Sequence, residues 1–157
     1  MKVIHWMITA LGLIFALPAV ADAATTDPEV IIYRFPGVLD DGGGIDAGVA
    51  TVFHCTNFSG VTENIRFVTR DFAGGLLQND ALSSTHLATK TVVTHQTHAY
   101  TSSLNLLTGP IFQGTTAIAA TSTNIICTAM TIEASTAAPI GVALRGIRFS
   151  PVPGSQE

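Results

Sequence analysis

The sequence predicts an all-β protein built as a single β-sandwich. Thr and Ala are its commonest residues, and β-branched side chains such as Thr and Val suit a pleated strand. Short apolar runs alternate with turns marked by glycine, proline or aspartate, and no stretch shows the 3.6-residue apolar period of a helix. A length of 157 residues with 47% hydrophobic content indicates one domain with a buried core.

Residues 1–23 are predicted to form a signal peptide that is cleaved. Lys2 supplies a short positive region, and the mostly apolar residues 3–20 carry no charge. Small residues then match the cleavage pattern twice, at 19–21 and at 21–23. We therefore expect a mature sandwich domain over residues 24–150, a polar tail over residues 151–157 and no membrane span in the mature chain. The protein is predicted to be secreted or periplasmic.

The mature chain divides into about seven to nine predicted strands. A core strand over residues 48–58 has apolar side chains on both faces, which favours a central position in a sheet. Residues 63–71 alternate, and Gly74 and Gly75 then mark a hairpin turn into Leu76 and Leu77. Residues 87–100 hold one long or two short strands. The other predicted strands cover residues 30–35, 111–112, 115–120, 124–132 and 141–149.

The last predicted strand contains an irregularity at Gly146. Val142 and Leu144 share one face, whereas Ile147 and Phe149 are out of phase with them by one residue. A β-bulge at Gly146 would return all four apolar side chains to one face. The sequence therefore predicts a bulge at this glycine.

Cys55 and Cys127 are the only cysteines in the chain. An even number of cysteines in an exported protein favours a disulfide bond. Both cysteines lie in apolar runs, so the bridge is expected to join two sheets, or distant strands of one sheet. A cysteine pair between strands makes the predicted sandwich immunoglobulin-like in outline.

Histidines are the leading candidates for a binding site. Four remain in the mature chain, and imidazole nitrogens are common ligands of copper and zinc. A small-ligand or metal site is therefore the alternative function. Asp40, Asp41 and Asp46 form an acidic loop that is also a candidate calcium site. The candidate histidines are His54, His86, His95 and His98.

The sequence carries no motif that names a reaction. The nucleophile elbow of hydrolases and the zinc-protease motif are both absent, and the carboxylates are scattered. We therefore expect no enzyme activity, no catalytic residue and no cofactor. The net charge of −4 gives no basic footprint for nucleic acid.

The predicted function is protein–protein contact. In size and in its abundance of Thr, Ala and Gly, the mature chain is similar to bacterial fimbrial subunits. That resemblance implies incomplete immunoglobulin-like domains that a strand from a neighbour completes. The Cys spacing is longer than in that family, and the final residues, SPVPGSQE, lack its aromatic-ended strand. We expect a non-catalytic subunit or accessory of an extracellular or periplasmic assembly, with an unknown protein partner or self-association.

Overall fold

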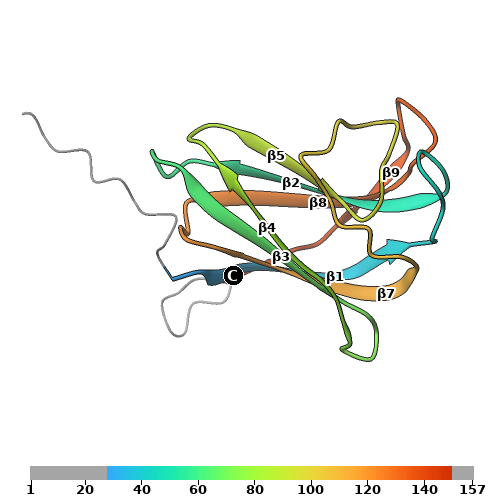
Figure 1. The fold of residues 1–157 in the computed structure, drawn as a ribbon, viewed down its shortest axis with the longest axis horizontal. Coiled ribbons are helices and arrows are strands. Elements are labelled where there is room, and N and C mark those ends of the chain that lie inside the picture. The colour runs from blue at the N-terminus through green and yellow to red at the C-terminus, as the bar shows by residue number, and fades with distance from the viewer. Residues whose placement is uncertain (1–27, 150–157) are drawn as a thin grey trace, which may run out of the picture.

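The computed structural model describes residues 28–149, and the predicted signal peptide and polar tail lie outside the described residues. Ten β-strands and no helix occupy residues 28–149. The strands form two five-stranded sheets stacked as two layers (Figure 1). The all-β prediction is therefore confirmed, and the two sheets are consistent with a sandwich. No helix long and apolar enough to cross a bilayer occurs between residues 28 and 149.

The first sheet has the antiparallel order β10-β1-β7-β3-β4, and the second has the order β6-β5-β2-β8-β9. Within residues 28–149, only β5 and β6 pair in parallel. The strands outnumber the predicted seven to nine because two of them, β6 and β10, contain just two residues each. The first sheet contains β1 (Val30–Asp40), β3 (Glu63–Arg70), β4 (Leu76–Ser84), β7 (Ile111–Ala120) and β10 (Ile147–Arg148). The second contains β2 (Val49–Asn57), β5 (Thr89–Val93), β6 (Leu104–Asn105), β8 (Ile125–Glu133) and β9 (Gly141–Leu144).

The main core lies between the two sheets. Phe35 on β1 and Phe67 on β3 each pack against Phe53 on β2, with ring centroids 5.7 and 5.8 Å apart. All three aromatic side chains are fully buried. Burial of such large apolar side chains is the main term that stabilises the sandwich. The predicted central strand is confirmed, because β2 pairs with β5 on one side and with β8 on the other.

The predicted disulfide is present between Cys55 and Cys127. The two residues lie directly opposite each other on neighbouring strands β2 and β8, with their Cα atoms 4.2 Å apart. The bridge therefore links two strands of one sheet that are 72 residues apart in sequence. The disulfide of immunoglobulin domains joins opposite sheets instead. This bridge gives no support for the immunoglobulin-like type that the sequence predicted.

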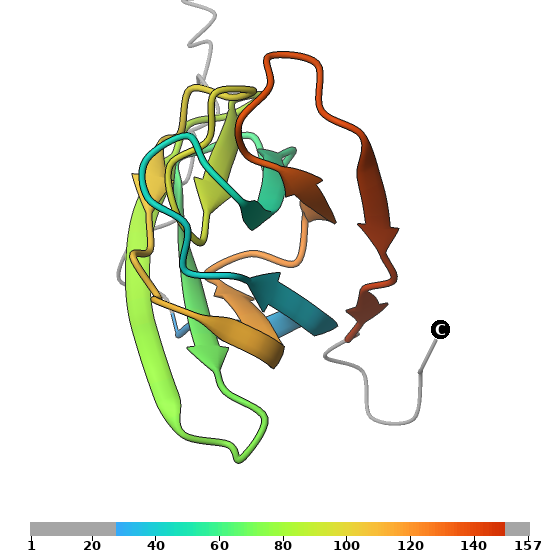
Figure 2. The same cartoon turned by 90° about the vertical axis from the view of Figure 1, so that its right-hand side faces the viewer.

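The chain changes sheets at the irregularity around Gly146. β9 pairs with β8 in the second sheet, and β10 pairs with β1 in the first. The red C-terminal segment thus runs along one side of the sandwich (Figure 2). A Cβ atom at Gly146 would lie 2.3 Å from the Phe35 ring, so the crossing needs a glycine. The structure has this crossing in place of the predicted bulge, and Val142 is exposed.

Residues 87–100 differ from their prediction, because β5 ends at Val93. The following loop, residues 94–103, folds over the outer face of the second sheet. There Ala99 and Tyr100 pack on a small second cluster formed by Val52, Val93 and Ile132. This packing fixes the loop that carries His95 and His98.

Candidate functional site

The structure separates the four candidate histidines. His54 lies on β2, His86 lies in the turn between β4 and β5, and His95 and His98 lie in the loop after β5. Across residues 28–149, no three His, Cys, Asp or Glu side chains gather as a metal-binding group. The structure instead forms two His–Asp pairs, which join the β5–β6 loop to the end of β1 and to the loop between β1 and β2.

His86 and His54 each bond to a neighbouring element. The Nδ1 atom of His86 accepts a hydrogen bond of 3.0 Å from the Gly60 amide, which ties two turns together. His54 lies under the β5–β6 loop. The centroid of its ring is 4.8 Å from that of the Tyr100 ring, in an edge-to-face arrangement. The Nδ1 atom of His54 lies 3.1 Å from the Thr91 hydroxyl. Both histidines therefore act as parts of the scaffold.

We expect His54 to make stability depend on pH. Burial lowers the pKa of His54 below its ordinary value of 6.5. As pH falls below 6.5, the unfolded chain therefore takes up a proton that the folded chain resists, and folding becomes less favourable. Urea unfolding at pH 7.5 and at pH 5.5 measures this loss. A His54→Gln variant should lose less stability between the two pH values than the wild type does. Equal losses in the two proteins would contradict this role.

His95 in the β5–β6 loop and Asp40 at the end of β1 form a buried pair. His95 is 8% exposed and Asp40 is 1% exposed. The Nδ1 atom of His95 lies 2.8 Å from Asp40 Oδ2, and its Nε2 atom lies 2.9 Å from the Ala47 carbonyl oxygen. A carboxylate oxygen and a carbonyl oxygen are both acceptors, so each ring nitrogen of His95 faces an acceptor. The pair joins the end of β1 to the β5–β6 loop.

The acidic loop uses two of its carboxylates internally. Asp40 Oδ1 accepts a hydrogen bond of 2.8 Å from the Gly42 amide, and Asp41 Oδ1 accepts one of 3.0 Å from the Gly43 amide. Hydrogen bonding by the backbone of Val49, and then of Gly43, lowers the pKa of Asp41 below its ordinary value. These carboxylates hold the loop in shape. Two of the three carboxylates considered as calcium ligands are therefore engaged in hydrogen bonds within the loop. Of the three, Asp46 remains.

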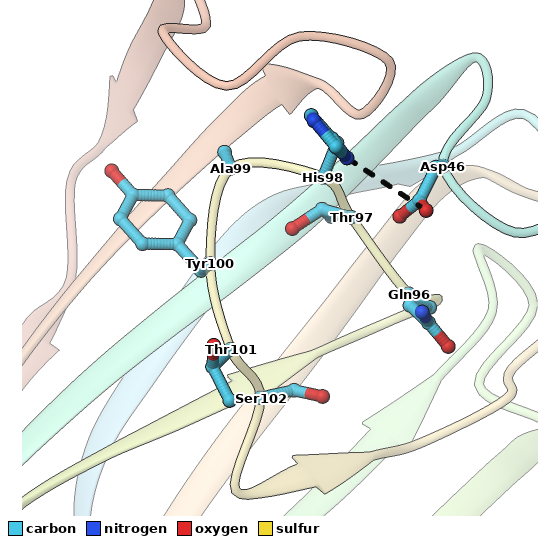
Figure 3. A pocket seen from close by; sticks show the side chains of 8 residues that line it. All are labelled: Asp46, Gln96, Thr97, His98, Ala99, Tyr100, Thr101 and Ser102. Atoms are coloured by element: carbon cyan, nitrogen blue, oxygen red, sulfur yellow. Dashed lines mark ion pairs between the residues drawn. The ribbon is translucent and has the colours of Figure 1, made fainter.

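Asp46 and His98 face a pocket of about 390 Å³ where the two loops meet (Figure 3). Asp46 Oδ2 lies 4.0 Å from His98 Nδ1. The Asp46 amide donates to the Gln96 carbonyl at 3.1 Å, and the His98 amide donates to the Ala134 carbonyl at 2.8 Å. The backbone of both residues is therefore anchored. The pocket is lined by Asp46, Gln96, Thr97, His98, Ala99, Tyr100, Thr101 and Ser102.

A second candidate surface is the outer edge of β4. Within residues 28–149, β4 pairs only with β3, so one side of this nine-residue strand has no strand beside it. Exposed apolar side chains flank both ends: Phe72, which is 80% exposed, and Leu76 at one end, and Leu87 at the other. Sequence reasoning missed most of this strand because its segment, LLQNDALSS, is mainly polar. Its pairing with β3 makes it a strand.

The chain was also compared with known proteins. No protein-family model, no curated protein and no solved structure matches it.

Proposed function

We propose that this protein is a secreted, non-catalytic β-sandwich that works by protein–protein contact, as a subunit or accessory of an extracellular or periplasmic assembly. The observation that carries the proposal is the free edge of β4. The predicted signal peptide over residues 1–23 supports export. The buried Cys55–Cys127 bond is compatible with the oxidising environment outside the cytoplasm.

The edge of β4 suits the addition of a strand from another chain. An edge strand presents backbone N–H and C=O groups that a partner strand can pair with. The other strands at the sheet edges are β6, β9 and β10, and they contain only two, four and two residues. β4 therefore offers the longest free edge in the part of the chain that the structure describes. The exposed Phe72, Leu76 and Leu87 extend the contact surface beyond it.

Asp80, at the centre of β4, indicates the chemistry of the partner. It lies opposite Phe67 on β3, so its carboxylate is on the inner face of the sheet at the edge. No ion pair within 4.0 Å joins Asp80 to a base of residues 28–149, and the charge of Asp80 acts on Arg66 only at longer range. A carboxylate there opposes pairing with a purely apolar strand. It favours an extended segment with a Lys or Arg facing Asp80.

The same carboxylate disfavours self-association through this edge. Asp80 is the middle residue of β4, with four strand residues on each side. Two copies that paired their β4 strands antiparallel about this centre would place Asp80 opposite Asp80. Like charges directly opposite each other destabilise a strand pair. We therefore infer a different protein as the partner.

A pair of probe peptides tests the proposal. Each has nine residues that alternate Val and Thr, with Lys at the centre of one and Glu at the centre of the other. We expect the Lys peptide to shift the backbone NMR signals of β4 and to bind about fivefold more tightly than the Glu peptide, because one charge pair is attractive and the other repulsive. Asp80→Lys should reverse this order.

The matched control is Glu133→Lys, which makes the same charge change at the exposed end of β8 in the other sheet. This variant should bind the peptides as the wild type does. Equal binding of both peptides by the wild type, or NMR shifts confined to regions other than β4, would overturn the proposal.

A further inference from the structure

The face of the first sheet that is turned away from the core carries a hollow over its central strand. Ala117 and Ala119 on β7 point to this face, because Ile118 between them lies in the core. Ala117 is only 7% exposed and Ala119 only 9%, since longer side chains of β1 and β3 lie on either side of them. The hollow has a volume of about 130 Å³, and besides the two alanines it is lined by Ile31, Arg34, Val68, Arg70 and Thr115.

Two arginines line this hollow from opposite sides. Arg34 lies on β1 and Arg70 lies on β3, and β7 runs between these two strands. Neither arginine forms an ion pair within 4.0 Å with a carboxylate of residues 28–149. Arg66, by contrast, is on the same face of β3 and is paired with Glu29. The hollow therefore holds two positive charges that the described part of the chain does not neutralise by direct contact.

Both guanidinium groups are held in place by uncharged partners. Arg34 Cζ lies 5.6 Å from the centroid of the Phe149 ring, and Arg70 Nη1 donates a hydrogen bond of 2.9 Å to the Gly74 carbonyl oxygen. These contacts leave most of the N–H donors unused, because each guanidinium has five. A planar fork of donors matches the two oxygens of a carboxylate. Because the forks are already positioned, less side-chain freedom is lost when an anion binds.

The rest of the hollow is apolar and continues along β7. Ile31 and Val68 form its walls, and the two alanines form its floor. Thr115 also lines a second hollow of about 380 Å³, nearer the start of β7. There Pro36 and Phe72, which is 80% exposed, offer apolar surface. A ligand that lies along β7 can therefore contact both arginines and an apolar surface next to them.

One carboxylate borders the second hollow and gives the ligand a direction. Asp71 Oδ1 accepts hydrogen bonds from the amides of Ala73 and Gly75, at 2.9 and 2.7 Å. This carboxylate is thus part of the turn between β3 and β4. Its negative charge repels an anionic group, whereas Arg34 and Arg70 attract one. The charged end of the ligand is therefore expected at the arginines, and its apolar end near Phe72.

We propose that this face binds a small organic anion, with its carboxylate between Arg34 and Arg70 and its apolar chain along β7 toward Phe72. The two guanidinium groups select an oxyanion as the head of the ligand. The apolar floor and walls favour a hydrocarbon chain over a bare inorganic anion, because burial of the chain adds to the free energy of binding. A free carboxylic acid with an alkyl chain of medium length satisfies both requirements. This site lies apart from the protein-binding edge proposed for β4.

NMR titration of the untagged protein with octanoate tests the site, with acetate and octylamine as comparison ligands. We expect octanoate to shift the backbone signals of residues 115–119 and of the flanking parts of β1 and β3. Acetate has the same head without the chain. It should bind about tenfold more weakly, since burial of only two methylene groups accounts for that factor. Octylamine has the chain with the opposite charge and should cause no shifts at this site.

Substitutions test the head and the chain separately. Arg34→Gln and Arg70→Gln should each weaken octanoate binding by about tenfold, because each removes charge-assisted hydrogen bonds. Ala117→Leu fills the floor of the hollow and should weaken octanoate binding by a similar factor. The matched control is Arg145→Gln, which removes the same charge at an exposed residue that lines neither hollow. This variant should bind octanoate as the wild type does.

Circular dichroism first establishes that each variant is folded, and the arginine variants decide the question if Ala117→Leu is not. Absence of octanoate binding to the wild type would overturn the proposal, and so would unchanged binding in both arginine variants. Equal binding of octanoate and octylamine would overturn it as unselective adsorption, and equal binding of acetate as an adventitious ion only. Preference for vesicles of phosphatidylglycerol over octanoate, measured by co-sedimentation, would overturn it in favour of a membrane surface. None of these results bears on Asp80, which lies on the inner face of the sheet at β4.

Discussion

Replacement of His95 by leucine is expected to lower the free energy of unfolding by about 3–5 kcal/mol, because it leaves the Asp40 carboxylate buried without its partner. Asp40 is 1% exposed, so water cannot take the place of the imidazole. The same change also removes the hydrogen bond from His95 to the Ala47 carbonyl. Urea unfolding followed by circular dichroism measures the loss.

His98 provides the matched control for this prediction. It lies in the same loop and faces Asp46, but its side chain is exposed and the pair is 4.0 Å apart. His98→Leu should therefore change the free energy of unfolding by less than about 0.5 kcal/mol. In the double variant Asp40→Asn/His95→Leu, part of the lost stability should return because the stranded charge is gone. If His95→Leu and His98→Leu had equal effects, the buried pair would not have the structural role assigned to it.

Removal of the disulfide is expected to lower the free energy of unfolding by about 4 kcal/mol. Cys55 and Cys127 close a loop of 72 residues, and the cross-link restricts the unfolded chain in proportion to the logarithm of that length. The variant Cys55→Ala/Cys127→Ala keeps small buried side chains at both positions. Its unfolding in urea, compared with that of the oxidised wild type, gives the difference.

The neighbouring pair on the same two strands separates the effect of the covalent bond from that of lost side chains. Thr56 lies opposite Ile126, one residue beyond the cysteines. Thr56→Ala/Ile126→Ala should lower the free energy of unfolding by about 1 kcal/mol, since Ile126 is half exposed. Thiol titration of the unreduced wild type should detect no free thiol. A cysteine double variant as stable as the alanine control would contradict the expected contribution of the bond.

Local pattern was enough to predict much of the fold. The run around Cys55 has apolar side chains on both faces, and this identified β2 as a central strand. The predicted export to an oxidising compartment and the even number of cysteines together predicted the Cys55–Cys127 bond. The phase change at Gly146 correctly marked an irregular position. Its form could not be predicted, because a bulge and a change of sheet give the same pattern of apolar residues along the chain.

The candidate site depended on contacts between segments far apart in sequence. His95 and His98 come close to Asp40 and Asp46 because the β5–β6 loop folds back over the second sheet, and no local signal encodes that path. The polar segment of β4 has weak strand propensity and becomes a strand by pairing with β3. No local pattern indicated that Asp80 lies on the inner face of an edge strand, although this position is what defines the proposed partner.

The pairing of β1 constrains how the protein can be assembled. The earliest strand of the described chain pairs with β7 and β10, and β10 is the latest strand. When the chain emerges with its N-terminus first, β1 therefore has neither of its neighbouring strands until about 80 further residues have emerged. Closing such long loops slows folding and leaves unpaired apolar strands able to aggregate.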